Sequence, residues 1–261
     1  MRSAKEALKH YPRLRAYLRS IRNLLRGGSR LSYAPISKEL IYRTVDKPDP
    51  TILDIGCNDG RHTLWFLQMF KKPRVFCFEP DPRAISRFKK TVGDPQNVRL
   101  FEIALSDQNG ETTFYQSRGA ADSSVSLPET WGMEEGWDAS GSIRKPKRHL
   151  IDYPQITFDE SVTVQTMTLD TWCDENGIEA IDFIWMDVQG AEMDVIRGGE
   201  KVLARTRYIY TEYSDKELYE GQSTLDQLLN ALPAFKILKR YPGDVLLENV
   251  ALPHSNSKGV T

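Results

Sequence analysis

The chain has 261 residues and a formal net charge of −1, from 35 Lys and Arg against 36 Asp and Glu. This balance gives no general electrostatic case for nucleic-acid binding, and the chain has no apolar run of about 18 residues that would span a membrane. Three cysteines without metal-ligand spacing, and a basic N-terminus without an apolar signal segment, indicate a reducing compartment, so we expect a cytoplasmic protein.

The first 28 residues are strongly basic, with a single acid among them. Apolar residues from Leu14 to Leu25 recur at helical spacing, and Gly27-Gly28 would end a helix. We predict a basic amphipathic helix over residues 1–26, inside an N-terminal helical extension at residues 1–46. Two interpretations stay open: the helix packs its apolar stripe on the domain, or it makes a peripheral contact with a membrane or a partner.

Residues 51–70 predict a short buried strand, a tight turn bracketed by Gly56 and Gly60, and a helix. Such a corner lets backbone N–H groups approach a ligand closely, and the helix N-terminus adds positive potential. Asn58 stands where a dinucleotide-binding loop has glycine, yet Asn tolerates the left-handed backbone of such a turn. Asp54 places a carboxylate before the first glycine, which suits a cationic ligand; a chance acid in an ordinary corner is the alternative.

The next predicted strand, residues 74–78, ends at Glu79-Pro80. An acid at about this distance from a glycine-rich turn binds the two hydroxyls of a ribose. Asp54 and Glu79 would then flank one pocket, the first suited to an amine and the second to a ribose. S-adenosylmethionine carries both groups together with a sulfonium cation, so we expect it as the cofactor.

A helix over residues 82–92 and strands over 98–105 and 111–115 follow. Residues 117–160 form the least regular part of the chain, which is typical of a lid or binding loop inserted in a compact domain. We expect contacts with the acceptor substrate here, because tryptophans beside polar groups suit the stacking of sugar rings; a mobile surface loop is the alternative. The candidates are Ser124, Trp131, Trp137, Arg144 and His149.

The second half of the chain alternates strands and helices again. A strand over 162–167 precedes a helix capped by Thr168 or Asp170, and the apolar run at 181–186 predicts a central buried strand. The remaining predicted elements are a strand at 208–211, a helix at 224–232, and two closing antiparallel strands at 235–238 and 245–250.

These elements predict an α/β fold with a doubly wound, mostly parallel, seven-stranded sheet whose last strand is antiparallel. We assign this domain to residues 47–252, with the insertion at 117–160 and a disordered tail at 253–261. Ligands of such sheets bind at the carboxyl ends of the strands.

Several short motifs are weak singly but specific in their order and spacing. They are Leu53-Asp54-Ile55-Gly56-Cys57-Asn58-Asp59-Gly60, Phe78-Glu79-Pro80, Ala104-Leu105-Ser106-Asp107, Ser123-Ser124, Thr168-Leu169-Asp170 and Met186-Asp187-Val188-Gln189-Gly190-Ala191-Glu192. Over roughly residues 50–250, this set resembles the FkbM family of S-adenosylmethionine-dependent methyltransferases. The resemblance implies a Rossmann-like fold, methylation of sugar or polyketide hydroxyls, and cofactor contacts that include Pro80, Ala104 and Leu105.

Methyl transfer to a hydroxyl requires that the acceptor oxygen is aligned with the methyl carbon, and a nearby base that takes the hydroxyl proton raises the rate. Asp187 follows the central strand beside the cofactor loop, so we predict that it is the base and also contacts the cofactor. Glu212, at the end of the next strand, is the second candidate; a helix cap and a structural hydrogen bond are the alternative roles. The family usually has Glu where this chain has Gln189, which with Tyr213 is expected to contact the acceptor.

Other chemistries remain open from the sequence. Asp187 and Glu212 could share a Mg²⁺ ion, since carboxylate oxygens suit it, but no further ligand spacing supports one. We expect a sugar, glycolipid or polyketide-type small molecule as the acceptor. The alternatives are a degenerate S-adenosylmethionine-binding interaction module and a nicotinamide-dependent oxidoreductase, which would favour glycine at Asn58.

Overall fold

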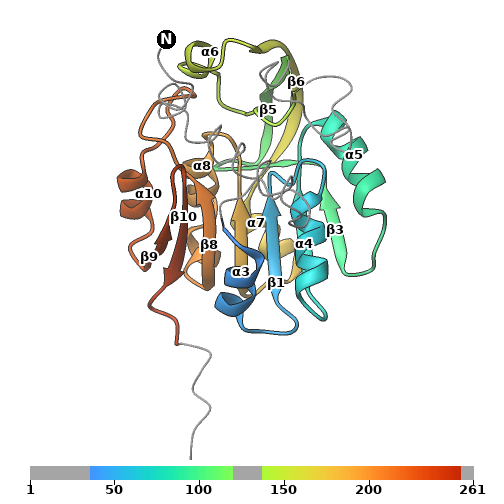
Figure 1. Ribbon diagram of the computed structural model, residues 1–261, viewed down its shortest axis with the longest axis vertical. Coiled ribbons are helices and arrows are strands. Elements are labelled where there is room, and N and C mark those ends of the chain that lie inside the picture. The colour runs from blue at the N-terminus through green and yellow to red at the C-terminus, as the bar shows by residue number, and fades with distance from the viewer. Residues whose placement is uncertain (1–35, 120–136, 254–261) are drawn as a thin grey trace, which may run out of the picture.

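Residues 36–119 and 137–253 are described in the computed structural model of the protein (Figure 1). Within these ranges, one large sheet has seven strands in the spatial order β3-β2-β1-β7-β8-β10-β9. Their bounds are Thr51–Ile55 (β1), Arg74–Phe78 (β2), Val98–Phe101 (β3), Ile181–Met186 (β7), Thr206–Glu212 (β8), Phe235–Arg240 (β9) and Asp244–Asn249 (β10). β10, the last strand in the chain, pairs antiparallel with β8 and with β9, and the other pairings in this sheet are parallel, so the predicted sheet is confirmed.

The strand order reverses at the centre of the sheet. β1 pairs in parallel with β2 on one side and with β7 on the other. The chain thus builds one half outward through β2 and β3 and the other through β7 and β8. A crevice for a ligand forms outside the carboxyl ends of the strands at such a reversal. Here that edge lies just beyond Ile55, Phe78 and Met186.

Helices cover both faces of the sheet (Figure 1). Successive strand residues point to opposite faces, so Ile52 and Phe183 belong to one core cluster and Leu53 and Ile184 to the other. The first cluster includes residues of α3, α4 and α5, and the second includes residues of α7, α8, α9 and α10. The helices are Lys38–Val45 (α3), Arg61–Met69 (α4), Pro82–Val92 (α5), His149–Asp152 (α6), Leu169–Asn176 (α7), Glu192–Arg197 (α8), Glu200–Leu203 (α9) and Leu225–Ala231 (α10).

Side-chain caps begin several of these helices where the sequence indicates them. The Thr168 hydroxyl accepts a hydrogen bond from the Thr171 N–H, which confirms the first of the two predicted caps of α7. Thr224 forms a capping box with Gln227 at the start of α10. These caps satisfy N–H groups that have no partner inside the helix.

α3 lies before the predicted start of the domain at residue 47, yet it packs on the large sheet. Its Ile41 and Val45 are buried in the same cluster as Ile52 and Phe183. α3 is therefore part of the domain core. Three other predicted features lie outside the described residues: the basic helix over 1–26, the tail beyond Pro253, and the acceptor candidates Ser124 and Trp131.

A second, smaller sheet was not predicted. It has the order β4-β6-β5, with strands Ala104–Ser106 (β4), Gly110–Gly119 (β5) and Ile156–Thr168 (β6), and lies at the top of Figure 1. The prediction of one strand over 98–105 is wrong, because β3 ends at Phe101 and the chain crosses at Glu102-Ile103 to pair with β6. Both halves are extended and partly apolar, so the hydrophobic pattern gives no sign of the break.

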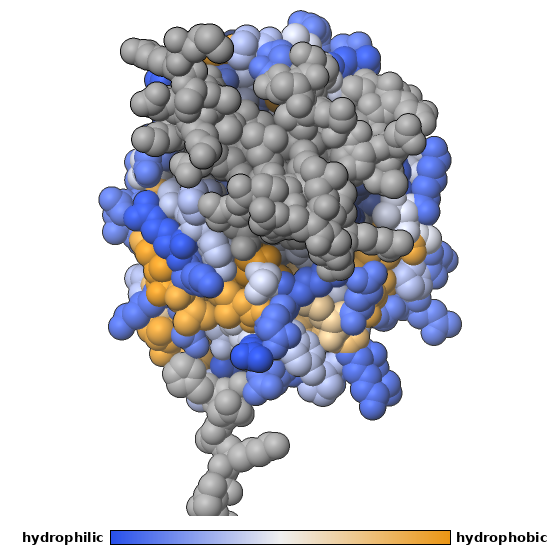
Figure 2. All heavy atoms as spheres, viewed as in Figure 1, coloured by the Kyte–Doolittle hydropathy of each residue, from blue (hydrophilic) through white to orange (hydrophobic). Residues whose placement is uncertain are grey.

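The sheet edge at β9 is exposed and bordered by charges. Its Ile237 and Leu238 are 43% and 46% accessible. Lys236, Lys239 and Arg240 on the same strand disfavour pairing with the edge of another sheet. Figure 2 shows a band of apolar residues across the middle of the viewed face, with hydrophilic residues below it. Within the two described ranges, no helix is long and apolar enough to cross a membrane.

Candidate active site

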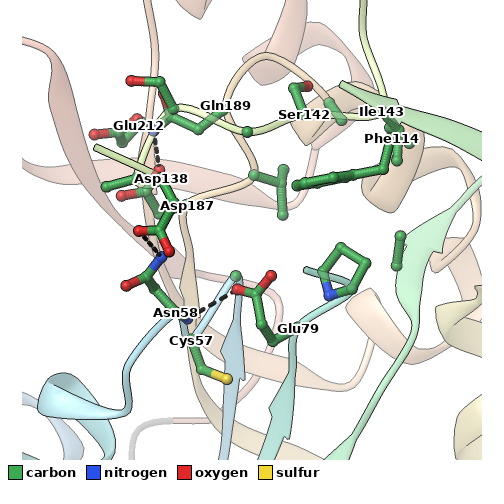
Figure 3. Close-up of a pocket in the computed structure, with 18 of the residues that line it drawn as sticks. Cys57, Asn58, Glu79, Phe114, Asp138, Ser142, Ile143, Asp187, Gln189 and Glu212 are labelled. Carbon is green, nitrogen blue, oxygen red and sulfur yellow. Dashed lines mark hydrogen bonds between the residues drawn. The ribbon is translucent and has the colours of Figure 1, made fainter. Parts of the chain in front are cut away.

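A cavity of about 420 Å³ lies at the carboxyl ends of β1, β2, β7 and β8, within the size range of small-molecule pockets. The loops after these strands form one side of it, and residues between 137 and 155, which precede β6, line the other (Figure 3). Most of the predicted cofactor contacts line it. They are Gly56, Asn58, Glu79, Pro80, Ala104, Leu105 and Asp187.

The turn after β1 has left-handed backbone at three positions. Gly56 and Gly60 have φ of +79° and +80°, and Asn58 has φ of +45°, so Asn takes the conformation expected of it. A Cβ atom on Gly56 would lie 2.0 Å from the Asp187 carbonyl oxygen. Gly56 therefore lets the loop after β1 approach the loop after β7. Gly60 packs on α5, where a Cβ would meet Val92, and does not line the cavity.

We expect Gly56→Ala to lower the free energy of unfolding by at least about 2 kcal/mol more than Gly177→Ala. Left-handed backbone costs a residue with a Cβ roughly 1–2 kcal/mol at either position. Gly177 ends α7 in open space, with nothing within 4 Å of its Cβ position, whereas Gly56 adds a backbone clash. Urea unfolding of the two variants measures the difference. Equal losses would contradict a close approach at Gly56.

Glu79 lies on the cavity wall and is anchored by backbone donors. Its Oε2 accepts from the Asn58 N–H at 2.9 Å, and its Oε1 accepts from the Asp81 N–H at 2.8 Å. Burial raises the pKa of this carboxyl to about 8, although both hydrogen bonds favour its ionised form. Each oxygen keeps a further acceptor site for a ligand donor.

Asp54, the other predicted acid of the cofactor pocket, does not line the cavity. Its side chain is fully buried in β1, and its Oδ2 accepts from the Thr63 hydroxyl at 2.6 Å. Among the described residues, Oδ1 has no hydrogen-bond partner, and burial raises the pKa of the carboxyl to about 7. Asp54 thus joins β1 to α4 behind the loop. The structure therefore does not place Asp54 on the cavity wall, and its predicted contact with an amine stays a prediction.

Asp187 and Glu212 lie side by side at the ends of neighbouring strands. Met186 pairs with Thr211, so the residues that follow share one edge of the sheet. The Gln189 side-chain nitrogen lies 2.5 Å from Asp187 Oδ1 and 3.0 Å from Glu212 Oε2. Figure 3 shows the three side chains together on one side of the cavity, opposite Phe114 and Ile143.

The segment from Trp137 to Ser142 closes the cavity and was only partly foreseen. Asp138 is buried, forms an ion pair with Arg87, and lies 3.4 Å from the Asn58 side-chain nitrogen. This contact ties the segment to the loop after β1. Trp137, predicted as an acceptor contact, lines the cavity, whereas Asp138 was missed because no pattern marks it in an irregular stretch.

The other acceptor candidates divide into two groups. His149 and Gln189 line the cavity. Arg144 and Tyr213 do not: Arg144 forms an ion pair with Asp194, and the Tyr213 hydroxyl donates to the Tyr241 carbonyl at 2.9 Å. Tyr213 follows Glu212, but successive residues point to opposite sides, so its ring turns away from the cavity.

The described residues contain no group of three or more His, Cys, Asp and Glu side chains arranged to hold a metal ion. Between Asp187 and Glu212 lies a hydrogen-bond donor, the Gln189 amide. A cation bound by both carboxylates would have to displace this amide. The Mg²⁺ alternative therefore gains no support from the arrangement of these side chains.

Comparison with known proteins identifies relatives over most of the chain. Residues 54–240 match the family model of the methyltransferase FkbM domain. The chain is 50% identical over 226 residues to the 2-O-methyltransferase NoeI of Sinorhizobium fredii, a match that covers 84% of this chain and 88% of that protein. It is 32% identical over 221 residues to the AMB antimetabolite synthetase AmbE of Pseudomonas aeruginosa, covering 77% of this chain and 10% of that protein.

Among solved structures, an rRNA methylase from Streptococcus thermophilus superimposes with a TM-score of 0.42 at 11% identity, covering 83% of this chain and 99% of that chain. The family match spans the glycine turn, Glu79 and the loop that follows β7. The chain therefore belongs to the FkbM family of S-adenosylmethionine-dependent methyltransferases.

Proposed function

We propose that the protein transfers the methyl group of S-adenosylmethionine to a hydroxyl oxygen of a sugar-type acceptor, with glycolipid or polyketide hydroxyls as the related classes. The observation that carries the proposal is the position of Asp187, a carboxylate on the cavity wall beside the glycine turn. The similarity to a protein named a 2-O-methyltransferase supports an oxygen acceptor. Membership of a methyltransferase family sets aside the nicotinamide-dependent alternative.

The residues at the β2 end of the cavity fit the nucleoside part of the cofactor. Glu79 keeps acceptor sites for two ribose hydroxyls after its bonds to Asn58 and Asp81. Pro80, Ala104 and Leu105 provide an apolar wall that suits an adenine ring. When bound, the cofactor supplies an electrophilic methyl carbon and leaves as a neutral thioether.

Asp187 would receive the proton of the acceptor hydroxyl as its oxygen bonds to the methyl carbon. Oδ1 accepts from Gln189, which leaves Oδ2 to take the proton. Such a base raises the reaction rate by about 10²–10⁴-fold. Alignment of the acceptor with the methyl group supplies much of the remaining rate enhancement. Trp137 and His149 line the same cavity and would hold the acceptor there. A polar ring fits an aromatic wall of this kind.

Incubation of the protein with S-adenosylmethionine and a panel of sugars, glycolipid precursors and polyketide alcohols tests this function. We expect one class of acceptor to gain a methyl ether, identified by mass spectrometry, together with S-adenosylhomocysteine. Transfer to nitrogen or carbon, with every hydroxyl acceptor unchanged, would contradict the proposal.

A further inference from the structure

The Gln189 amide sits between two acidic side chains at the centre of the candidate site. Its nitrogen is within hydrogen-bond distance of Asp187 and of Glu212, whereas its Oε1 lies 3.2 Å from the Tyr219 hydroxyl. The reverse orientation of the amide would put an oxygen against two carboxylate oxygens. The two N–H donors therefore point to Asp187 and Glu212, one to each.

The backbone is shaped to hold this side chain in place. Gln189 has φ of +52°, which is uncommon for a residue with a Cβ and costs roughly 1–2 kcal/mol. Gly190 follows with φ of +96°, and a Cβ there would lie 2.9 Å from the Tyr219 ring. The single proton of the Tyr219 hydroxyl is within reach of both the Gln189 Oε1 and the Ser140 carbonyl, which lies nearer at 2.8 Å, and this contact links the loop to the segment that closes the cavity. Strained backbone of this kind clusters at functional sites.

The groups around Asp187 and Glu212 determine how much the two carboxylates depend on the Gln189 donors. The titratable and charged groups on the elements packed around this pair are Asp54 (β1), Arg61 and His62 (α4), His149 (α6), Glu192 and Asp194 (α8), Tyr210 (β8), Tyr219 and Asp244 (β10). Arg61 is paired with Asp59, Arg144 is paired with Asp194, and burial lowers the pKa of His62 to about 3. Two neighbouring carboxylates in such a place favour uptake of a proton by one of them.

We propose that Gln189 is a positioning residue that keeps Asp187 and Glu212 ionised together and orients Asp187 toward the acceptor. The amide offers one donor to each carboxylate, and hydrogen bonds to the charged form favour that form. Without them, repulsion between the two neighbouring carboxylates would disfavour the form in which both are ionised. This inference rests on the proposed role of Asp187 as the base.

The test is the pH profile of kcat/KM for the acceptor, measured at saturating S-adenosylmethionine, in Gln189→Glu. This variant keeps the shape of the side chain and replaces the donors with a third carboxylate. We expect the acidic limb to move upward by about one pH unit or more, because like charges disfavour ionisation. Activity at pH 7 should fall about tenfold or more and recover at pH 9. Gln189→Met, which removes the donors without adding charge, should move the limb in the same direction by less.

Gln116→Glu is the matched control. Gln116 is also buried and also donates to a carboxylate, Asp81 Oδ1 at 2.9 Å, but it does not line the cavity. The acidic limb of the pH profile of Gln116→Glu should lie at the same pH as in the parent protein. An equal loss of activity at every pH in both Gln189 variants, or an unchanged pH profile, would overturn the positioning role.

The Asp187→Asn variant separates this inference from the proposed function. If Asp187→Asn is inactive while the pH profiles of both Gln189 variants stay unchanged, the inference fails and the proposed function stands. If Asp187→Asn is fully active, the assigned base is wrong and the inference fails with it.

Discussion

Asp187→Asn is expected to lower kcat by about 10²–10⁴-fold while leaving the affinity for S-adenosylmethionine nearly unchanged. Asn keeps the shape of the side chain, and its Oδ1 still accepts from the Gln189 amide, which lies 2.5 Å from the Asp187 oxygen. What the variant loses is a group that takes up the acceptor proton. Steady-state kinetics, together with calorimetric titration of S-adenosylhomocysteine, separate the two effects.

Asp182→Asn is a matched control on the same strand. Asp182 lies at the opposite end of β7, where it accepts from Lys47 and from the Thr51 N–H, far from the cavity edge. The kcat of Asp182→Asn should stay within about twofold of that of the parent, since substitutions away from the site usually change the free energies by less than about 0.5 kcal/mol. Glu212→Gln should have a smaller effect than Asp187→Asn. A fully active Asp187→Asn enzyme would move the search for the base to Glu212.

At a pH above 8, Glu79→Ala is expected to weaken the binding of S-adenosylhomocysteine by roughly 10- to 150-fold. Hydrogen bonds to a charged group contribute about 1.5–3 kcal/mol, and about 1.4 kcal/mol corresponds to a factor of ten. The variant removes the carboxylate that accepts from Asn58 and Asp81 and faces the cavity. Unchanged affinity in calorimetry would remove Glu79 from the ribose site.

The affinity should also depend on pH in a defined direction. Burial raises the pKa of Glu79 to about 8, so below this pH the free protein holds the carboxyl protonated. Ribose hydroxyls donate to the ionised form, and binding therefore releases a proton. Affinity should rise by up to about tenfold per pH unit below pH 8 and level off above it. Glu79→Gln should bind with a flat pH dependence, and a flat profile in the parent protein would contradict the assignment.

The sequence predicts the sheet well because the strands that matter carry strong local signals. The apolar run at Ile181–Met186, the glycines of the turn after β1 and the capping residue Thr168 each specify one local structure, and each is confirmed. The break at Glu102-Ile103 has no such signal, because both flanking stretches are extended and partly buried. Which sheet a short strand joins is decided by tertiary pairing, here with β6.

The candidate site follows from the sequence only where the strand ends determine it. Glu79 and Asp187 come directly after a parallel strand, and Glu212 is the last residue of one, so their meeting at one edge is predictable. Asp54 lies within β1, and its side chain is directed between the sheet and α4, where it bonds to Thr63. Sequence spacing places the residue near the turn but does not give the direction of its side chain.

Gln189 shows a further limit of residue-type reasoning. An amide in place of an acid suggests a lost proton acceptor, but the fold uses the same side chain as a donor to two carboxylates. Asp138 likewise gains its place only through Arg87 and Asn58, which lie far from it in the chain. Contacts of this kind depend on the packed loop and not on any local pattern.

A structure with S-adenosylhomocysteine bound is the most direct test of the proposed site. We expect the ribose hydroxyls to bond to the Glu79 carboxylate and the sulfur to lie at the Asp187 end of the cavity, beside the glycine turn. A ligand bound in the opposite direction, with its adenine beside Asp187, or one bound outside this cavity, would contradict it.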